Sequence, residues 1–168
     1  METTKVWQKV TEKKYIFSVG AKRIGTLEIS NSKWNPSALL DVDGQLFTIE
    51  QSGFWKNKLQ LVDYKGNLIL KMVPKNWFSS TAVVVYQNEY LQLKVRNNPL
   101  AEVLLIKNET ELLSYGLKIF EGKIVTQIKS VEENNDYLLD FLLWFLFRTV
   151  AHENFGEDLV FQTLLLQP

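Results

Sequence analysis

The sequence contains no cysteine, only one histidine and no long apolar run near its start. Without cysteine, the chain can form neither disulfides nor metal sites built on thiolates. The single histidine, His152, has Glu153 and Glu157 nearby, but one histidine is a poor basis for a zinc site or a catalytic triad. The first residues, METTKVWQKV, lack the apolar core of a secretory signal. We therefore expect a cytoplasmic protein.

Neither sign of charge is in excess, because 19 Lys and Arg residues balance 19 Asp and Glu residues. Domains that bind nucleic acid usually carry a basic excess. We therefore expect no general nucleic-acid binding, although this balance is compatible with a local basic patch. The chain has 168 residues, of which 46% are apolar, and both values are typical of one globular domain. We predict a single domain over residues 1–168.

The usual motifs of catalysis and cofactor binding are also missing. No serine lies in a nucleophile-elbow pattern. Gly20 and Gly25 do not make a phosphate-binding loop. Asp41 and Asp43 precede Gly44, but a calcium loop needs more acidic ligands at fixed positions, and a hairpin turn explains these residues without metal. We expect no enzyme activity, no metal and no cofactor.

The most apolar stretch is DYLLDFLLWFLFRTVAHE, residues 136–153. As a helix it would carry large apolar side chains in every direction, which is typical of a helix in a protein core or in a membrane. Its uninterrupted apolar run covers only residues 141–147, between Asp140 and Arg148, whereas a membrane span needs about 20 apolar residues. We interpret the stretch as a core helix. An interfacial or partner-binding helix is the alternative.

This helix interpretation makes specific predictions for side chains. We expect Phe141, Leu142, Phe145 and Leu146 to be almost wholly buried by strands of the same chain. We expect Arg148 to reach the open end of the fold, with its guanidinium in water or against a carboxylate, because an unpaired buried charge is costly.

The rest of the chain reads as short strands separated by turn residues. Asp43-Gly44 is the strongest hairpin signal, and Gly44 should have a positive φ there. Gly25 indicates a bulge or a close approach within a strand. Residues 1–13 are a tail or a short first strand. Eleven strands are predicted before the helix: 14–19, 22–29, 38–42, 45–51, 58–63, 67–73, 81–86, 90–96, 101–107, 111–120 and 123–130.

Successive hairpins of this number predict a closed barrel. A long antiparallel meander avoids exposed edges best by closing on itself. A barrel of about twelve strands is too wide to be filled by its own side chains, so the apolar helix would fill it. We predict a mainly β protein, a closed antiparallel barrel of about twelve strands around a central hydrophobic C-terminal helix.

This pattern resembles the tubby C-terminal-like superfamily, which includes tubby domains, the plant LURP-one-related proteins and the phospholipid scramblases. The resemblance rests on the GAKRIGTLEI hairpin, the run LDVDGQLFTIEQSGFWKNKLQLVDYKGNLIL and the late helix YLLDFLLWFLFRTVA. It implies a twelve-stranded barrel around a central helix. The best-known tubby domains bind phosphoinositide head groups through surface Lys and Arg, so the resemblance also suggests phospholipid binding.

Basic residues near aromatic ones are the candidate binding site. Lys56 and Lys58 follow two aromatic residues at the start of a predicted strand, and Lys22 and Arg23 lie on another hairpin. Together they would form a patch suited to an anionic lipid head group. The alternative is that they are ordinary solvated lysines and arginines on strand edges. Three tryptophans near loops favour packing at the barrel ends over a binding surface: Trp34, Trp55 and Trp77.

Two classes of function remain open at this stage. The first is a non-catalytic binding module whose partner is an anionic membrane surface or a protein. The second is an intracellular carrier of small, lipid-type molecules. A carrier needs an empty lumen, whereas the predicted helix would occupy it.

Overall fold

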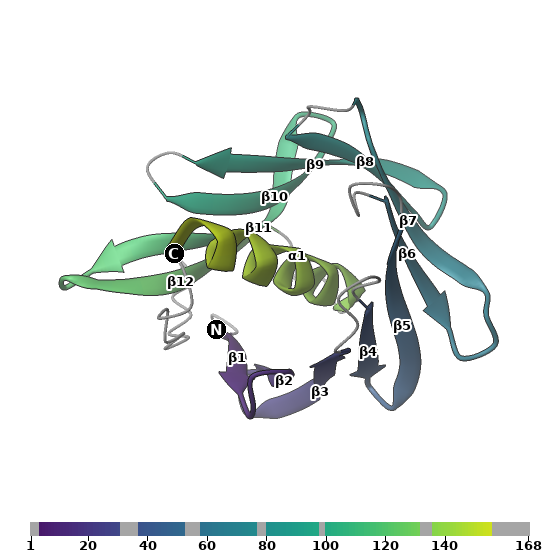
Figure 1. Ribbon diagram of the computed structural model, residues 1–168, viewed down its shortest axis with the longest axis horizontal. Coiled ribbons are helices and arrows are strands. Elements are labelled where there is room, and N and C mark those ends of the chain that lie inside the picture. Colours follow the sequence, from purple (N-terminus) through teal and green to yellow (C-terminus); the bar gives the residue numbers. More distant parts are fainter. Residues whose placement is uncertain are drawn as a thin grey trace.

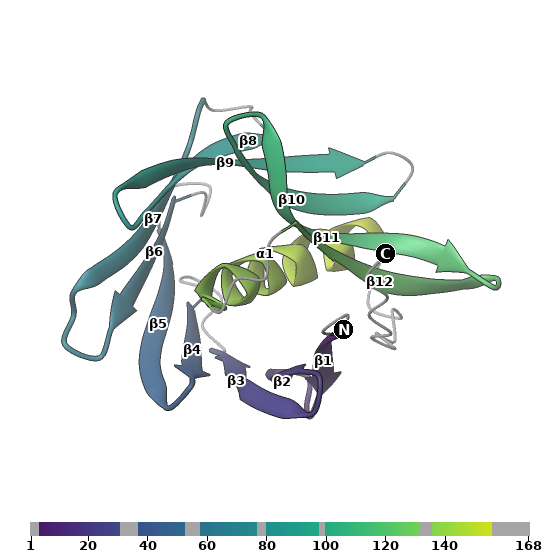
Figure 2. The ribbon, with the colours of Figure 1, turned by 180° about the vertical axis from the view of Figure 1, so that it is seen from behind.

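The computed structural model describes residues 4–30, 37–52, 58–76, 80–97, 100–131 and 136–155, with helix side chains as far as Arg148. Twelve antiparallel strands form one sheet in sequence order and curl into a nearly closed barrel, and one helix runs through it (Figures 1 and 2). The strands are β1 Lys5–Lys9, β2 Lys14–Val19, β3 Lys22–Ile29, β4 Ser37–Val42, β5 Gln45–Ser52, β6 Lys58–Asp63, β7 Leu68–Pro74, β8 Thr81–Tyr86, β9 Glu89–Asn97, β10 Ala101–Lys107, β11 Thr110–Phe120 and β12 Lys123–Ser130. The helix is α1, Leu138–Phe155.

This architecture confirms the predicted fold class. The eleven predicted strands form, with ends that differ by no more than one residue, and the undecided first segment supplies β1. The helix begins and ends two residues later than predicted, which is within the ordinary fraying of helix ends.

The hairpin turns follow the predicted chemistry. Asp43 and Gly44 have φ values of 49° and 79°, so both central positions of this two-residue turn are left-handed, as a type I′ turn requires. The prediction for Gly44 is confirmed. The same pair of positive φ values recurs at three further hairpins, Gln87-Asn88, Asn108-Glu109 and Glu121-Gly122.

Gly25 marks both a bulge and a close approach. The β2–β3 register shifts between Phe17, which pairs with Gly25, and Ser18, which pairs with Arg23. A Cβ atom at Gly25 would lie 1.8 Å from the Asp41 carbonyl oxygen on β4. Only glycine lets the two backbones come this close.

The barrel has one interruption, the seam between β1 and β12. Each of these strands is hydrogen-bonded to one neighbour only, β1 to β2 and β12 to β11, within the ranges that the structure describes. Every other strand pairs on both sides. At the seam, therefore, side-chain contacts hold the barrel together, whereas backbone hydrogen bonds join the strands everywhere else.

The helix α1 fills the barrel with its apolar side chains. Five of these side chains are fully buried and Phe145 is 1% exposed; the five are Phe141, Leu142, Leu143, Trp144 and Phe147.

The helix begins beside Asp136, whose Oδ1 accepts a hydrogen bond of 3.2 Å from the Leu138 backbone N–H. This contact satisfies one of the N–H groups that a helix start leaves unpaired.

Two of the side-chain predictions for α1 need correction. Leu146 is only partly buried, although it packs against the core, because it lies on a different side of the helix from the fully buried Phe145 and Phe147. Arg148 is half-buried, and its Nε atom is buried without a hydrogen-bond partner among the described residues. Its guanidinium is therefore less fully solvated than we expected.

Within the described ranges, α1 does not have the length and apolarity that a membrane-crossing helix needs.

Candidate functional site

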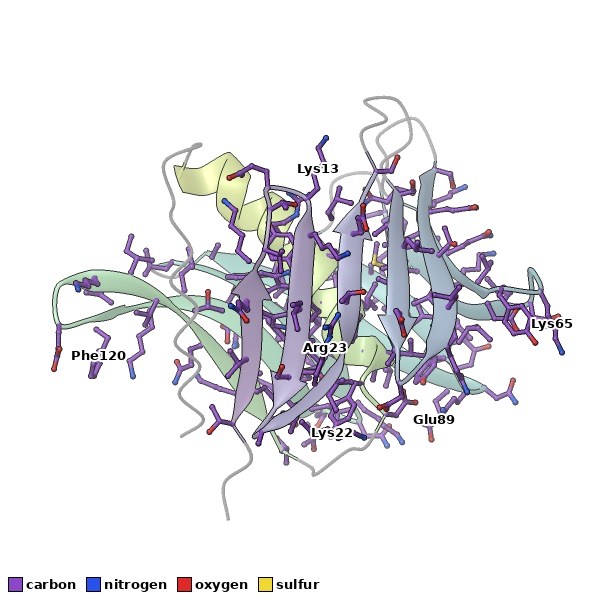
Figure 3. All side chains as sticks on the ribbon, turned by 90° about the horizontal axis from the view of Figure 1, so that it is seen from below. Lys13, Lys22, Arg23, Lys65, Glu89 and Phe120 are labelled. Carbon is purple, nitrogen blue, oxygen red and sulfur yellow. The ribbon has the colours of Figure 1, made fainter. Side chains whose placement is uncertain are left out.

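Lys22 and Arg23 lie at the end of the barrel where β3 begins (Figure 3). Both side chains are exposed. The Lys22 Nζ lies 3.2 Å from the Asp43 Oδ1 on the adjacent turn, so an acidic neighbour already offsets one of these charges. An exposed pair of this kind contributes little to stability and is screened by salt.

Lys58 lies at the opposite end of the barrel. It begins β6, which runs antiparallel to β3, and it pairs with Ser52 at the far end of β5. Lys56 lies outside the described residues. The structure therefore does not bring Lys58 together with Lys22 and Arg23 into one patch, because strand direction separates them. Whether either end binds an anion stays a prediction.

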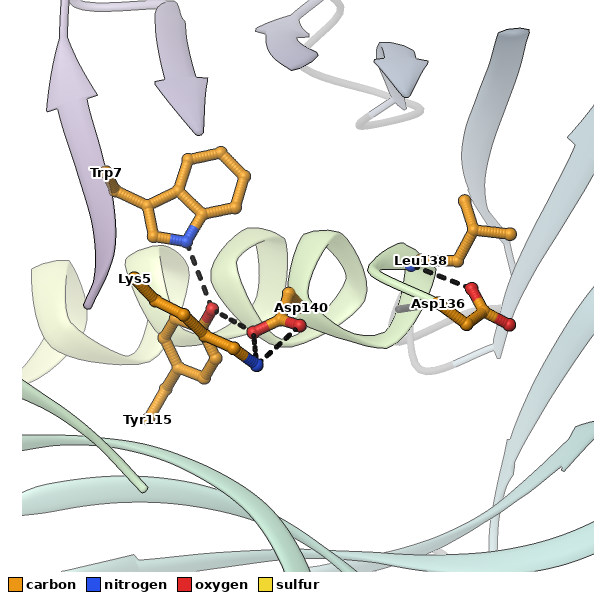
Figure 4. Close-up of polar contacts among 6 residues, drawn as sticks. All are labelled: Lys5, Trp7, Tyr115, Asp136, Leu138 and Asp140. Atoms are coloured by element: carbon orange, nitrogen blue, oxygen red, sulfur yellow. Dashed lines mark hydrogen bonds and ion pairs between the residues drawn. The ribbon is translucent and has the colours of Figure 1, made fainter. Parts of the chain in front are cut away.

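A buried polar network joins β1, β11 and α1 (Figure 4). The Lys5 Nζ donates to both carboxylate oxygens of Asp140, at 3.0 and 2.9 Å. The Tyr115 hydroxyl donates to Asp140 Oδ1 at 2.7 Å and accepts a hydrogen bond of 3.1 Å from Trp7 Nε1. Lys5 is 6% exposed and Asp140 2%, so this is a desolvated ion pair. It ties the first strand to the helix directly behind the seam.

Burial controls the electrostatics of this network. It raises the pKa of the Asp140 carboxyl above its ordinary value, although the Lys5 charge and the Tyr115 hydrogen bond act in the opposite direction. Burial also raises the pKa of the Tyr115 hydroxyl well above its ordinary value, and the charge of Asp140 adds to this effect. Tyr115 thus stays protonated and remains a hydrogen-bond donor at neutral pH.

A cleft of about 40 Å³ opens beside this network. Its walls come from β1, β11, β12 and the start of α1, and its lining residues are Lys5, Leu112, Leu113, Ser130, Asp136, Leu139 and Asp140. The volume suits one or two water molecules and is far below the roughly 300–1,000 Å³ of ordinary ligand pockets. Asp136 is already engaged, since its Oδ2 accepts hydrogen bonds from the Tyr86 hydroxyl and from Gln87 Nε2.

The β11–β12 hairpin forms a different kind of surface. It extends away from the barrel in Figures 1 and 2, and Phe120 lies at the far edge of the molecule in Figure 3. Ile119 is 61% exposed, Phe120 44% and Ile124 37%. The hairpin also carries exposed Lys118 and Lys123. Neither lysine has an ion-pair partner among the described residues.

The other candidate residues either serve a hairpin turn or lie outside the described part of the chain. Asp41 and Asp43 serve the hairpin turn, where Asp41 Oδ1 accepts a hydrogen bond of 3.1 Å from the Gly44 backbone N–H. The side chain of His152 lies outside the described residues, as do Trp34, Trp55 and Trp77. Within the described ranges, no group of His, Asp and Glu side chains is arranged to hold a metal ion.

Sequence reasoning missed both the buried network and the exposed hairpin tip. One signal for the network was visible, because Asp140 interrupts an otherwise apolar helix and a buried carboxylate needs a partner. Its partner Lys5 is 135 residues away, and nothing local points to it. The tip residues look like ordinary strand residues in the sequence.

Comparisons of this chain with protein-family models, with curated proteins and with solved structures find no match. The resemblance to the tubby-like group therefore stays a prediction.

Proposed function

We propose that this protein is a non-catalytic binding module that attaches to an anionic membrane surface through its exterior. The observation that carries the proposal is the exposed β11–β12 hairpin, which combines Ile119, Phe120 and Ile124 with Lys118 and Lys123, two lysines without an ion-pair partner in the part of the chain that the structure describes. Exposed apolar patches on soluble domains usually mark contact surfaces, and adjacent lysines favour an anionic partner.

The packed interior argues against the carrier alternative. A carrier would need space for an apolar ligand inside the barrel, but α1 occupies that space with fully buried Phe141, Trp144 and Phe147. The cleft beside Lys5 is too small for a lipid chain. Binding at the outer surface is the function that this arrangement supports best.

Vesicle co-sedimentation tests the proposal. The protein should pellet with vesicles of phosphatidylcholine and phosphatidylserine, and far less with phosphatidylcholine alone. Binding should weaken as salt rises from about 0.05 to 0.5 M, because salt shortens the range of exposed charges. Failure to bind any anionic vesicle, or equal binding to neutral vesicles at all salt concentrations, would contradict the proposal.

The same assay addresses the residues that the sequence singled out. Arg23→Glu and Lys58→Glu reverse charges at opposite ends of the barrel and leave the hairpin intact. If the hairpin is the contact, each variant should bind about as the unmodified protein does. A large loss in either variant would place the lipid contact at that end of the barrel.

A further inference from the structure

We infer that the β11–β12 hairpin lies in the membrane interface, with its Ile119 and Ile124 side chains toward the acyl chains and its lysines toward the lipid phosphates. This inference rests on the proposed function and specifies its contact element and orientation. The hairpin divides its residues between two faces.

The two faces differ in chemistry. Ile119 pairs with Ile124 directly across the hairpin, so these side chains share one face. By strand alternation this is the face that carries Tyr115 and Ile128, which are fully buried inside the barrel. The apolar inner face of the barrel wall thus continues beyond the core and becomes exposed at the hairpin.

The opposite face carries the charges. Phe120 pairs with Lys123, and Lys118 pairs with Val125 two residue pairs further on, beyond the pair of Ile119 and Ile124. Lys118, Phe120 and Lys123 alternate with the isoleucines and therefore point the other way.

A membrane interface suits both faces at once. Its polarity changes over a few ångströms, so one side of the hairpin can meet acyl chains while the lysines extend to phosphates. Phe120 then lies at the boundary level, where aromatic rings are commonly found. Glu121 is at the turn and is the one acidic residue there, so the hairpin lies along the surface and does not enter it end-on.

The absence of cysteine allows a direct test. Ile119→Cys gives a single site for an environment-sensitive dye. Tyr64→Cys is the control, because Tyr64 is also exposed and its neighbour Lys65 lies at the opposite side of the molecule from Phe120 (Figure 3). With anionic vesicles, the dye at position 119 should shift to shorter wavelengths and brighten, while the dye at position 64 should not change.

A second pair of variants measures the contribution to affinity. Ile119→Ser combined with Ile124→Ser removes the apolar face without changing charge, and should weaken binding to anionic vesicles about tenfold or more. Leu68→Ser removes an apolar side chain whose exposure, 54%, lies between those of Ile119 and Ile124, from the β6–β7 hairpin, and it should leave binding unchanged.

The outcomes separate this inference from the proposed function. If the unmodified protein binds anionic vesicles but the dye at position 119 stays in water and the serine variant binds normally, the hairpin assignment is wrong and the proposed function stands. If the unmodified protein binds no vesicle, both are wrong. If gel filtration shows a dimer that the Ile119→Ser and Ile124→Ser variant abolishes, a second copy covers this face and the hairpin assignment is also overturned.

Discussion

At the scale of single residues, the ion pair of Lys5 and Asp140 has the largest energetic consequences. Taking two charges out of water costs several kcal/mol, and their attraction offsets this cost only with good geometry and additional hydrogen bonds. Here the contact is bidentate and Tyr115 supplies a further hydrogen bond. Removing one partner leaves the other charge buried and unpaired.

Lys5→Met should therefore destabilise the protein by about 3–5 kcal/mol near neutral pH. The loss should depend on pH. Without Lys5, the pKa of Asp140 rises further above its value of about 3.9 in the unfolded chain, so the folded state binds more protons than the unfolded state. The contribution of Asp140 to the stability of this variant is then most favourable below about pH 4 and is lost as pH rises through the folded pKa. Urea unfolding at pH 5 and pH 8 measures this difference.

The matched control combines Lys5→Met with Asp140→Leu. With both charges gone, the double variant should be more stable at pH 8 than Lys5→Met alone, and the extra pH dependence should disappear. Equal pH dependence in the single and double variants would show that Asp140 is not the titrating group.

Gly25 gives a second prediction at this scale. Gly25→Ala should cost at least about 2 kcal/mol, because its Cβ would overlap the Asp41 carbonyl oxygen and the β3 and β4 backbones would have to separate. Gly116→Ala is the comparison. Its added Cβ would lie 3.1 Å from the Cγ of Glu102, which belongs to a flexible side chain. Its cost should be about 1 kcal/mol or less. Thermal unfolding compares the two, and equal stabilities would refute the close approach as the reason for Gly25.

At the scale of elements, the strands and the helix could be predicted because their signals are local. Two-residue turns such as Asp43-Gly44 fix hairpins through backbone conformation alone. The apolar stretch that became α1 is visible in its composition. Such features depend on neighbours in sequence, and the structure reproduces them almost residue for residue.

The candidate site could not be predicted in the same way, because it depends on how elements meet. Lys22 and Lys58 both begin strands, but their strands run in opposite directions and separate them. Ile119 has the character of a core residue, yet its hairpin extends beyond the core that would cover it. Whether an apolar strand residue is buried or exposed depends on the assembled barrel, and the local sequence does not distinguish Ile119 from a core residue.

The seam predicts a difference in stability between strands. β1 has a backbone ladder on one side only within the described ranges, whereas β5 is paired with both β4 and β6. Amide hydrogen exchange should therefore be faster in β1 than in β5 under native conditions, because edge segments open at lower free energy. Equal protection of the two strands would mean that the free edge of β1 is paired as well.

At the scale of the whole molecule, the side chains of α1 occupy the interior of the barrel and pack against the strands. Trp7 from β1 stacks on Trp144 of the helix, with ring centroids 5.1 Å apart, and meets Phe141 edge-on at 4.9 Å. The wall and its contents thus form one core. A ligand inside the barrel would have to displace these rings, so the proposal of binding at the outer surface depends on the helix being central.

Urea denaturation of Phe145→Ala tests this claim most directly. Phe145 is 1% exposed, so its removal should leave a cavity and lower the free energy of unfolding by about 3–5 kcal/mol. Leu146→Ala changes the next residue, which is only partly buried, and should lower the free energy of unfolding by clearly less. A loss below about 1 kcal/mol for Phe145→Ala would contradict the account, because it would place the helix on the surface and leave the barrel interior open.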